Sequence, residues 1–406
     1  MKRALLLGSP HETALVAAGT ALIAGTYGLV RLAYGLFLSD IQASVGLTSV
    51  QAGYVASGAS VVYAVSALVG MIADRWPQLV VLGALGTAAL GSAGMAVAPG
   101  SATFVPAAIV SSAGAGLASP GLVAVIARGV SSAHRDQAQA VVNAGTGPGL
   151  VAAGALALVL LPHWRVGFAI GAGFTVAAGS AVLLLSRSRT TDTGAADLIE
   201  RSVSSPPAER SWRGLAPLRR PAFGAMLLGA ASAAVWTYGR AHLVAEGLDV
   251  TASTLAWMAL GVGGAATLIS SGPQARLAPP RAWALTSAAT AVSIAALALG
   301  SGLPGIATIA CVIFGWTFVA ATSALIAWAS SLVPDQAASG TAVLFVSLTL
   351  GQAVGSTAVG AAADHVGRPL AFLGAAAAAA LATACGLHTP SHASTEAIRD
   401  GEESLA

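Results

Sequence analysis

The feature that most constrains this chain is a series of apolar runs, each about 20 residues long, that recur from one end to the other. As a helix, a run of that length crosses the hydrocarbon core of a bilayer. Of the 406 residues, 56% are apolar and 9% are charged, which leaves too few charges to cover a soluble surface. The runs are continuous and do not alternate with period two, so a transmembrane β-barrel is disfavoured. The sequence therefore predicts an all-α integral membrane protein.

Short turns rich in Gly, Pro and charged residues divide the apolar sequence into twelve predicted spans. The spans cover residues 14–38, 50–71, 78–98, 103–127, 137–161, 165–186, 221–245, 252–271, 282–300, 304–329, 337–361 and 368–388. One long polar segment interrupts them, with seven arginines and the pair Pro206-Pro207. We therefore predict a six-helix bundle over residues 1–186, a linker over 187–220, a second six-helix bundle over 221–388 and a tail over 389–406.

The distribution of basic residues predicts the orientation of the chain. With both termini inside, fifteen of the 19 Lys and Arg residues lie on the inner side and three on the outer side, and Arg31 lies within a span. Cytoplasmic loops carry the excess of Lys and Arg, so we expect the linker and both termini in the cytoplasm. The chain is predicted to be a multi-pass protein of the cell membrane.

The two predicted halves repeat each other. Ser131-Ser132-Ala133-His134-Arg135-Asp136-Gln137-Ala138 recurs as Ser330-Ser331-Leu332-Val333-Pro334-Asp335-Gln336-Ala337, each time between the fourth and fifth span of a half. Gly46-Leu47 and Gly247-Leu248 likewise precede the second span of each half. The constant offset of about 200 residues indicates a duplicated architecture. Such duplication is typical of secondary transporters, whose substrate site lies between the halves.

A short loop motif carries a family resemblance. After the second span comes Gly70-Met71-Ile72-Ala73-Asp74-Arg75-Trp76-Pro77. It resembles the Gly-x-x-x-Asp-Arg-x-Gly loop of the major facilitator superfamily at Gly70, Asp74 and Arg75, and departs from it at Pro77. With twelve spans in two halves, the resemblance covers nearly the whole chain and implies that family's fold. It also implies that this loop, with the Asp136 and Asp335 loops, takes part in gating.

Two further segments resemble the same family. Gly145-Thr146-Gly147-Pro148-Gly149 in the fifth span is similar to a motif of the family's antiporters, and we expect a helix kink at Gly147 and Pro148. The alternative is a packing kink with no bearing on the direction of transport. His163-Trp164-Arg165 resembles the turn before the family's sixth helix, with Trp164 expected at headgroup depth.

Arg31 is the clearest functional candidate, because a charge inside the membrane is costly. It lies seven residues before the end of the first span, about 10 Å below the outer surface. Tyr27 and Tyr34 share its helical face at α-helical spacing. We expect Arg31 to line a water-filled cavity and to bind an anion such as a carboxylate. A structural ion pair and snorkelling to the outer headgroups are the alternatives.

The family resemblance implies that the first, fourth, seventh and tenth helices line the cavity. The expected cavity residues besides Tyr27, Arg31 and Tyr34 are Ser119, Trp236, Arg240, Trp316 and Thr317. For Arg240, which lies nearer the outer surface, anchoring at the interface is the competing role. Asp and Glu are missing from the middle of every span, so proton coupling would require Asp40, His242 or the substrate itself.

The sequence thus predicts a secondary transporter of a small organic solute, favouring an anionic carboxylate, that works by rocking of the two halves and could couple to protons. A multidrug or metabolite efflux antiporter is the alternative. A membrane enzyme is disfavoured because the sequence shows no catalytic cluster, and a sensor because it has no sizeable soluble domain. A channel is disfavoured by the duplicated six-helix halves. The two cysteines lie in apolar runs, and the seven histidines do not cluster as metal ligands. We expect a monomer in the bilayer without cofactor, metal or nucleic acid.

Overall fold

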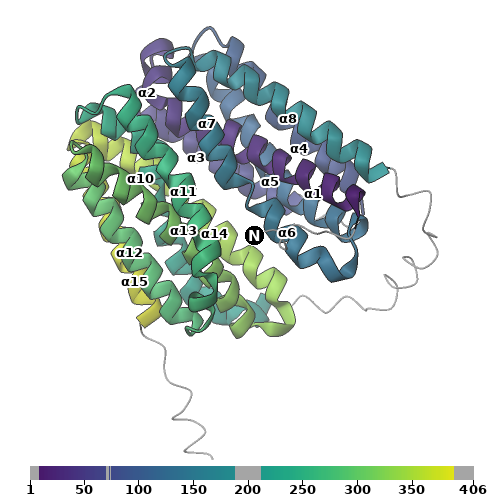
Figure 1. The fold of residues 1–406 in the computed structure, drawn as a ribbon. Coiled ribbons are helices and arrows are strands. Elements are labelled where there is room, and N and C mark those ends of the chain that lie inside the picture. The colour runs from purple at the N-terminus through teal and green to yellow at the C-terminus, as the bar shows by residue number, and fades with distance from the viewer. Residues whose placement is uncertain (1–8, 70–72, 74, 188–211, 388–406) are drawn as a thin grey trace, which may run out of the picture.

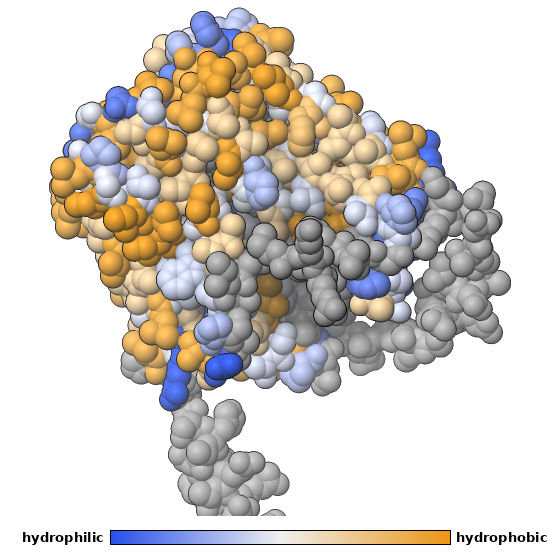
Figure 2. Space-filling model, viewed as in Figure 1, coloured by the Kyte–Doolittle hydropathy of each residue, from blue (hydrophilic) through white to orange (hydrophobic). Residues whose placement is uncertain are grey.

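In the computed structural model, residues 9–69, 73, 75–187 and 212–387 are described, and every regular element within these ranges is a helix. Twelve of the helical segments are long and apolar enough to cross a membrane. They form two lobes of six, coloured purple to teal and green to yellow in Figure 1. Apolar residues dominate the visible sides of the molecule, and the strongly hydrophilic residues gather toward its ends (Figure 2). The predicted all-α membrane fold is confirmed.

The first lobe follows the predicted order of spans. The first span joins α1 (Pro10–Ile23), the π-helix η1 (Ala24–Leu32) and α2 (Ala33–Val45); the others are α3 (Ser49–Val69), α4 (Pro77–Val97), α5 (Ser101–Gly129), α6 with α7 (Arg135–Asn143 and Thr146–Leu160) and α8 (Trp164–Arg187). The first span is longer than the predicted 14–38 at both ends. It begins at Pro10, where Ser9 caps the helix by accepting a hydrogen bond from the Glu12 amide, and it ends at Val45. A short 3-10 helix, η3 (Ser132–His134), precedes α6.

The second lobe repeats this order. It contains α10 (Arg219–Ala245), α11 (Val250–Ala275), α12 (Pro279–Gly300), α13 (Pro304–Leu332), α14 (Ala337–His365) and α15 (Arg368–Leu387), with short 3-10 helices η4 (Trp212–Leu218) and η5 (Pro334–Gln336). Gly46 and Gly247, at the same turn in each half, have φ of 72° and 96°. This left-handed conformation is strained for a residue with a Cβ, which explains why Gly recurs at both positions.

We call the end of the molecule with the α8 terminus and the start of α10 the linker face, and the opposite end the far face. The lobes touch along three helix pairs: α2 with α10, α3 with α14, and α7 with α11. At the α2–α10 contact the two backbones come very close, because a Cβ on Gly35 of α2 would lie only 2.0 Å from the carbonyl oxygen of Trp236 in α10. A residue with a side chain at position 35 would therefore push α2 and α10 apart.

The middle of the first span is the π-helix η1, which carries Tyr27 and Arg31. A π-helix has hydrogen bonds from i to i+5 and is frequent at functional sites. Across Ala24–Leu32 it shifts the register of side chains relative to a regular α-helix. Leu38, one turn after Tyr34, is fully buried, and the Thr20 hydroxyl donates to the carbonyl of Val16 in its own helix.

The fifth span breaks one turn before the predicted kink. α6 ends at Asn143 and α7 begins at Thr146, so the break falls at 144–145 and not at Gly147 and Pro148. A proline ring clashes with the carbonyl four residues earlier, which here belongs to Ala144. Pro148 therefore occupies the first turn of α7, where its missing N–H leaves no hydrogen bond unmade.

Candidate functional site

A cavity of about 830 Å³ lies between the two lobes and is lined by both. Among its described lining residues, Arg31 is the one charged side chain, and no carboxylate is present. Val123 and Ile326, in the halves of α5 and α13 nearest the linker face, line it and remain 49% and 44% exposed. The cavity is therefore open toward the linker face, while the contacts of α2 with α10 and of α3 with α14 close the far face.

Arg31 extends into this cavity from the π-helix. Its guanidinium carbon lies 4.3 Å from the ring centroid of Tyr63, in a cation–π contact. Its Nε is buried without a hydrogen-bond partner, and no ion pair to Arg31 occurs in the described ranges. Of the three roles considered for this residue, the geometry favours the cavity role, because the guanidinium has neither a carboxylate partner nor a place in the lipid-facing surface.

A chain of hydroxyl groups stands beside Arg31. The Tyr27 hydroxyl lies 3.0 Å from the hydroxyls of both Tyr63 and Ser119. Three hydroxyl groups carry three hydrogens, and the two bonds within the chain use two of them. One hydrogen is therefore left on the chain and can be donated to a ligand near the guanidinium.

The second lobe forms the opposite wall, which is rich in hydroxyl groups. Thr267, Thr322 and Thr349 all line the cavity, and each donates its hydroxyl hydrogen to a carbonyl in its own helix, at 2.6, 2.7 and 2.8 Å. Trp236 also lines the cavity and packs edge-on against Phe314 and Phe318. This wall is neutral, and its three threonine oxygens keep lone pairs for a ligand.

The predicted cavity residues divide into two groups. Tyr27, Arg31, Tyr34, Ser119 and Trp236 line the cavity, as do Gly147 and Pro148 of the fifth span. The structure does not bring Trp316 and Thr317 to it. Trp316 donates from Nε1 to the Ser270 hydroxyl 2.7 Å away, and Thr317 is buried against α12, where it accepts from Thr290 at 2.9 Å.

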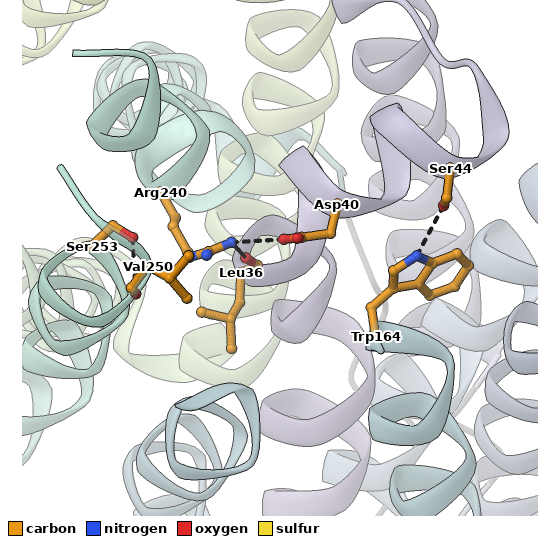
Figure 3. Close-up of polar contacts among 7 residues, drawn as sticks. All are labelled: Leu36, Asp40, Ser44, Trp164, Arg240, Val250 and Ser253. Atoms are coloured by element: carbon orange, nitrogen blue, oxygen red, sulfur yellow. Dashed lines mark hydrogen bonds and ion pairs between the residues drawn. The ribbon is translucent and has the colours of Figure 1, made fainter. Parts of the chain in front are cut away.

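Arg240 lies outside the cavity and bridges the two lobes at the far face. Its Nη1 donates to the Leu36 carbonyl at 2.8 Å and to Oδ2 of Asp40 at 3.0 Å, so that α10 is tied to α2 (Figure 3). The Arg240 side chain is 2% exposed and that of Asp40 is 20% exposed. We name this ion pair the far-face latch. Arg240 is neither an interfacial anchor nor a cavity residue, because it is buried between the lobes in the ion pair with Asp40 and does not line the cavity.

His242, the other candidate for proton coupling, is fully buried away from the cavity. Its ring stacks on Phe372 at 4.4 Å between centroids, and Nε2 is 3.1 Å from the Leu297 carbonyl. Nδ1 lies 3.9 Å from a Glu246 carboxylate oxygen. The ring is thus packed within the second lobe, near the far face.

Further polar contacts join the lobes beside the latch. The Tyr238 hydroxyl lies 3.0 Å from the Ser49 carbonyl, which belongs to the other lobe. The Val50 amide donates to Asp364 at 3.3 Å, and the Ser57 and Thr357 hydroxyls are 2.6 Å apart. Together with the latch, these contacts form a closed seam along the far face.

Several predicted gating residues are only partly visible. Gly70 and Asp74 lie outside the described residues, as do the side chains of Asp136 and Asp335. Arg75 is exposed, and its guanidinium lies 5.6 Å from the Trp76 ring centroid. Gating by this loop stays a prediction.

The glycines of the fifth span pack against the π-helix. A Cβ on Gly28 would lie 2.3 Å from the Gly149 carbonyl carbon, and one on Gly149 would lie 2.6 Å from the Ala24 carbonyl oxygen. This contact fixes the segment that carries Tyr27 and Arg31. The motif therefore has a packing role here.

Sequence reasoning missed the contributions of the second, eighth and eleventh spans. Tyr63 of α3, Thr267 of α11 and Gln352 of α14 line the cavity. Tyr63 lies in a mostly apolar span, and that unusual hydroxyl was the available signal. The threonines carry no such signal, because Thr also occurs on lipid-facing and packed helix surfaces.

Comparisons with known proteins agree with this architecture. The nucleoside transporter NupG superposes with a TM-score of 0.71 at 14% identity, covering 93% of this chain and 98% of NupG. A bacterial homologue of the human lysosomal transporter Spinster, inward-facing and unoccupied, gives 0.70 at 14% identity, covering 93% and 97%. A POT family transporter in complex with a thioalcohol-conjugated peptide gives 0.72 at 13% identity, covering 93% and 95%.

At the level of sequence, no curated protein gives a significant match. The family model of the Major Facilitator Superfamily matches residues 20–356, from within the first span of the first lobe, through the linker, into the fifth span of the second lobe. With twelve apolar helices in two lobes of six around a shared cavity, the chain belongs to the major facilitator superfamily of membrane transporters.

Proposed function

We propose that this transporter carries a small organic anion, held by its carboxylate at Arg31. One observation carries the proposal: the guanidinium stands in the cavity between the lobes with no carboxylate partner among the described residues. Its planar fork of N–H groups matches a carboxylate, and Tyr63 lies under its face.

The energetics favour an anionic ligand over a neutral one. Transfer of a charged group out of water costs several kcal/mol when it stays unpaired. In the open cavity, water solvates the Arg31 guanidinium in part. This water is expelled when the cavity closes. A bound carboxylate replaces the lost solvation, so the ligand would make the closed, occupied state more accessible than the closed, empty one.

Transport would proceed by alternating access, with the two lobes rocking about the cavity. The far-face latch and the seam beside it hold the present state, which is open toward the linker face. The positive-inside rule assigns the linker face to the cytoplasm. Opening of the far face then requires separation of Asp40 from Arg240, and the direction of net transport follows from the gradients.

Purified protein in proteoliposomes provides the test. Uptake of radiolabelled carboxylates is compared with uptake of neutral solutes of the same size, for wild type, Arg31→Gln and Arg31→Lys. Arg281→Gln is the matched control, because Arg281 is exposed at the start of α12 and does not line the cavity. We expect Arg31→Gln to lose carboxylate uptake at least tenfold and Arg31→Lys to keep part of it, since a bidentate hydrogen bond to a charged group is worth about 1.5–3 kcal/mol. Equal anion uptake by wild type and Arg31→Gln contradicts the proposal.

Proton coupling stays a prediction for Asp40 and His242. Neither lines the cavity: Asp40 is held in the latch, and His242 is packed on Phe372. The same liposomes with and without a pH gradient separate proton-coupled transport from uniport or exchange. The efflux alternative is tested by adding apolar cations to the same set of solutes. Their preferential transport would indicate a drug antiporter.

A further inference from the structure

The two walls of the cavity differ in the hydrogen-bonding groups that they offer to a ligand. This difference indicates which neutral groups the substrate carries besides its negative charge. The first lobe supplies donors: the guanidinium of Arg31 and the free hydroxyl hydrogen of the Tyr63–Tyr27–Ser119 chain. A guanidinium has donors and no acceptor. This wall therefore suits a carboxylate, whose two oxygens both accept hydrogen bonds.

The second lobe supplies acceptors. A threonine hydroxyl has one hydrogen, and in Thr267, Thr322 and Thr349 that hydrogen is already given to a helix carbonyl. Each oxygen keeps a lone pair for a ligand. Gln352 adds an amide to the same wall: Nε2 donates one of its two hydrogens to the Ser232 hydroxyl at 3.3 Å, and the amide oxygen remains an acceptor.

Ligand groups that face these threonine oxygens therefore need hydrogens to donate. Hydroxyls, ammonium groups and amide N–H groups do so, but an amide also carries a carbonyl oxygen that needs a donor of its own. An ammonium needs a carboxylate to offset the loss of its water, and no Asp or Glu occurs among the described lining residues. Neutral hydroxyls need no such partner and match single oxygen lone pairs.

We infer that the substrate is a hydroxylated carboxylate, with its carboxylate at Arg31 and its hydroxyl groups on the threonine wall of the second lobe. This inference rests on the proposed anion transport and narrows its substrate class. A cavity of about 830 Å³ lies in the usual range of small-molecule sites and accommodates an acid of about six carbons.

Binding to the full-length protein in detergent, measured by titration calorimetry, tests the inference. The probes are acids paired by carbon number, glycerate with propionate and gluconate with hexanoate, together with sorbitol as a neutral polyol. Within each pair the charge is constant and the hydroxyl content changes. We expect gluconate to bind at least tenfold more tightly than hexanoate, and sorbitol to bind more weakly than gluconate.

The variants Thr322→Val and Thr349→Val remove one acceptor each with little change of shape. Each should weaken gluconate binding about threefold to tenfold and leave hexanoate binding unchanged. Thr308→Val is the matched control, because Thr308 makes the same kind of bond to its own helix, to the Pro304 carbonyl at 2.8 Å, on an exposed surface of α13. A normal melting temperature for each variant shows that the fold is intact.

The outcomes separate the inference from the proposed function. If the paired acids bind equally and Thr322→Val has no effect, while Arg31→Gln abolishes binding, the hydroxyl inference is overturned and anion recognition stands. If sorbitol binds as tightly as gluconate, or if Arg31→Gln binds gluconate normally, the proposed function fails as well. Absence of binding by both hydroxylated acids also overturns the inference.

Discussion

The far-face latch gives the sharpest prediction about conformation. Asp40→Asn keeps the shape of the side chain and removes the charge that Arg240 faces at 3.0 Å. In the closed far face, the Arg240 side chain is 2% exposed, so water cannot replace the lost carboxylate. When the far face opens, water can reach the guanidinium. The substitution therefore penalises the closed state and leaves the open state nearly unaffected.

The magnitude follows from burial. Removal of one partner from a buried charge pair costs about 2–5 kcal/mol. Asp40 is 20% exposed, Asn still accepts a hydrogen bond, and the Leu36 carbonyl still accepts from Arg240, so we expect the lower end. A shift of about 2 kcal/mol raises the ratio of open to closed far face about 30-fold.

Cysteine accessibility measures this shift. Ser57→Cys reports on the seam, because the Ser57 hydroxyl contacts Thr357 of the other lobe at 2.6 Å. The native Cys311 and Cys385 are replaced by Ala, and a membrane-impermeant maleimide is added to intact cells. Closed seams protect the thiol, so Asp40→Asn should accelerate labelling by up to about 30-fold.

The control is Asp249→Asn, which removes a carboxylate that caps α11 within a single lobe, where Asp249 accepts from the Ala252 amide at 2.8 Å. Equal labelling rates for Asp40→Asn and Asp249→Asn, with both proteins folded in the membrane, refute the latch. The double variant Asp40→Asn with Arg240→Gln should label more slowly than Asp40→Asn alone, since no unpaired buried charge remains.

The remaining predictions concern the cavity and its support. In the proteoliposome assay, Arg31→Gln should lower carboxylate uptake at least tenfold, while Arg281→Gln leaves it unchanged. Tyr27→Phe removes the centre of the hydroxyl chain and should weaken carboxylate binding about twofold to tenfold by calorimetry, with Tyr54→Phe on the exposed surface of α3 as the control. Gly28→Ala forces a Cβ to within 2.3 Å of the α7 backbone and should destabilise the protein by about 1–3 kcal/mol in a thermal melt. Gly173→Ala, where a Cβ meets no atom within 4 Å, should melt like wild type.

Sequence alone determined the parts of this protein that depend on local composition. Hydropathy over about 20 residues places a helix in the membrane whatever its neighbours are, so all twelve spans were predictable. The paired turn glycines Gly46 and Gly247 were visible as a repeat, since positive φ is a local requirement. Arg31 was also identifiable, because a lone charge in an apolar run is costly wherever the helix packs.

The tertiary structure decided which of these helices meet and which polar groups face each other. Arg240 and Asp40 are 200 residues apart, and nothing in either span indicates that they pair. Trp164 is 2% exposed and donates from Nε1 to the Ser44 hydroxyl at 2.9 Å, beside the latch on α2 (Figure 3), a partner 120 residues away that its place before the sixth span does not indicate. The π-helix likewise packs closely on α7, where Gly28 meets Gly149. Long-range packing selects such contacts, and hydropathy does not encode them, because a helix with several nearly equivalent apolar faces satisfies the bilayer in any rotation.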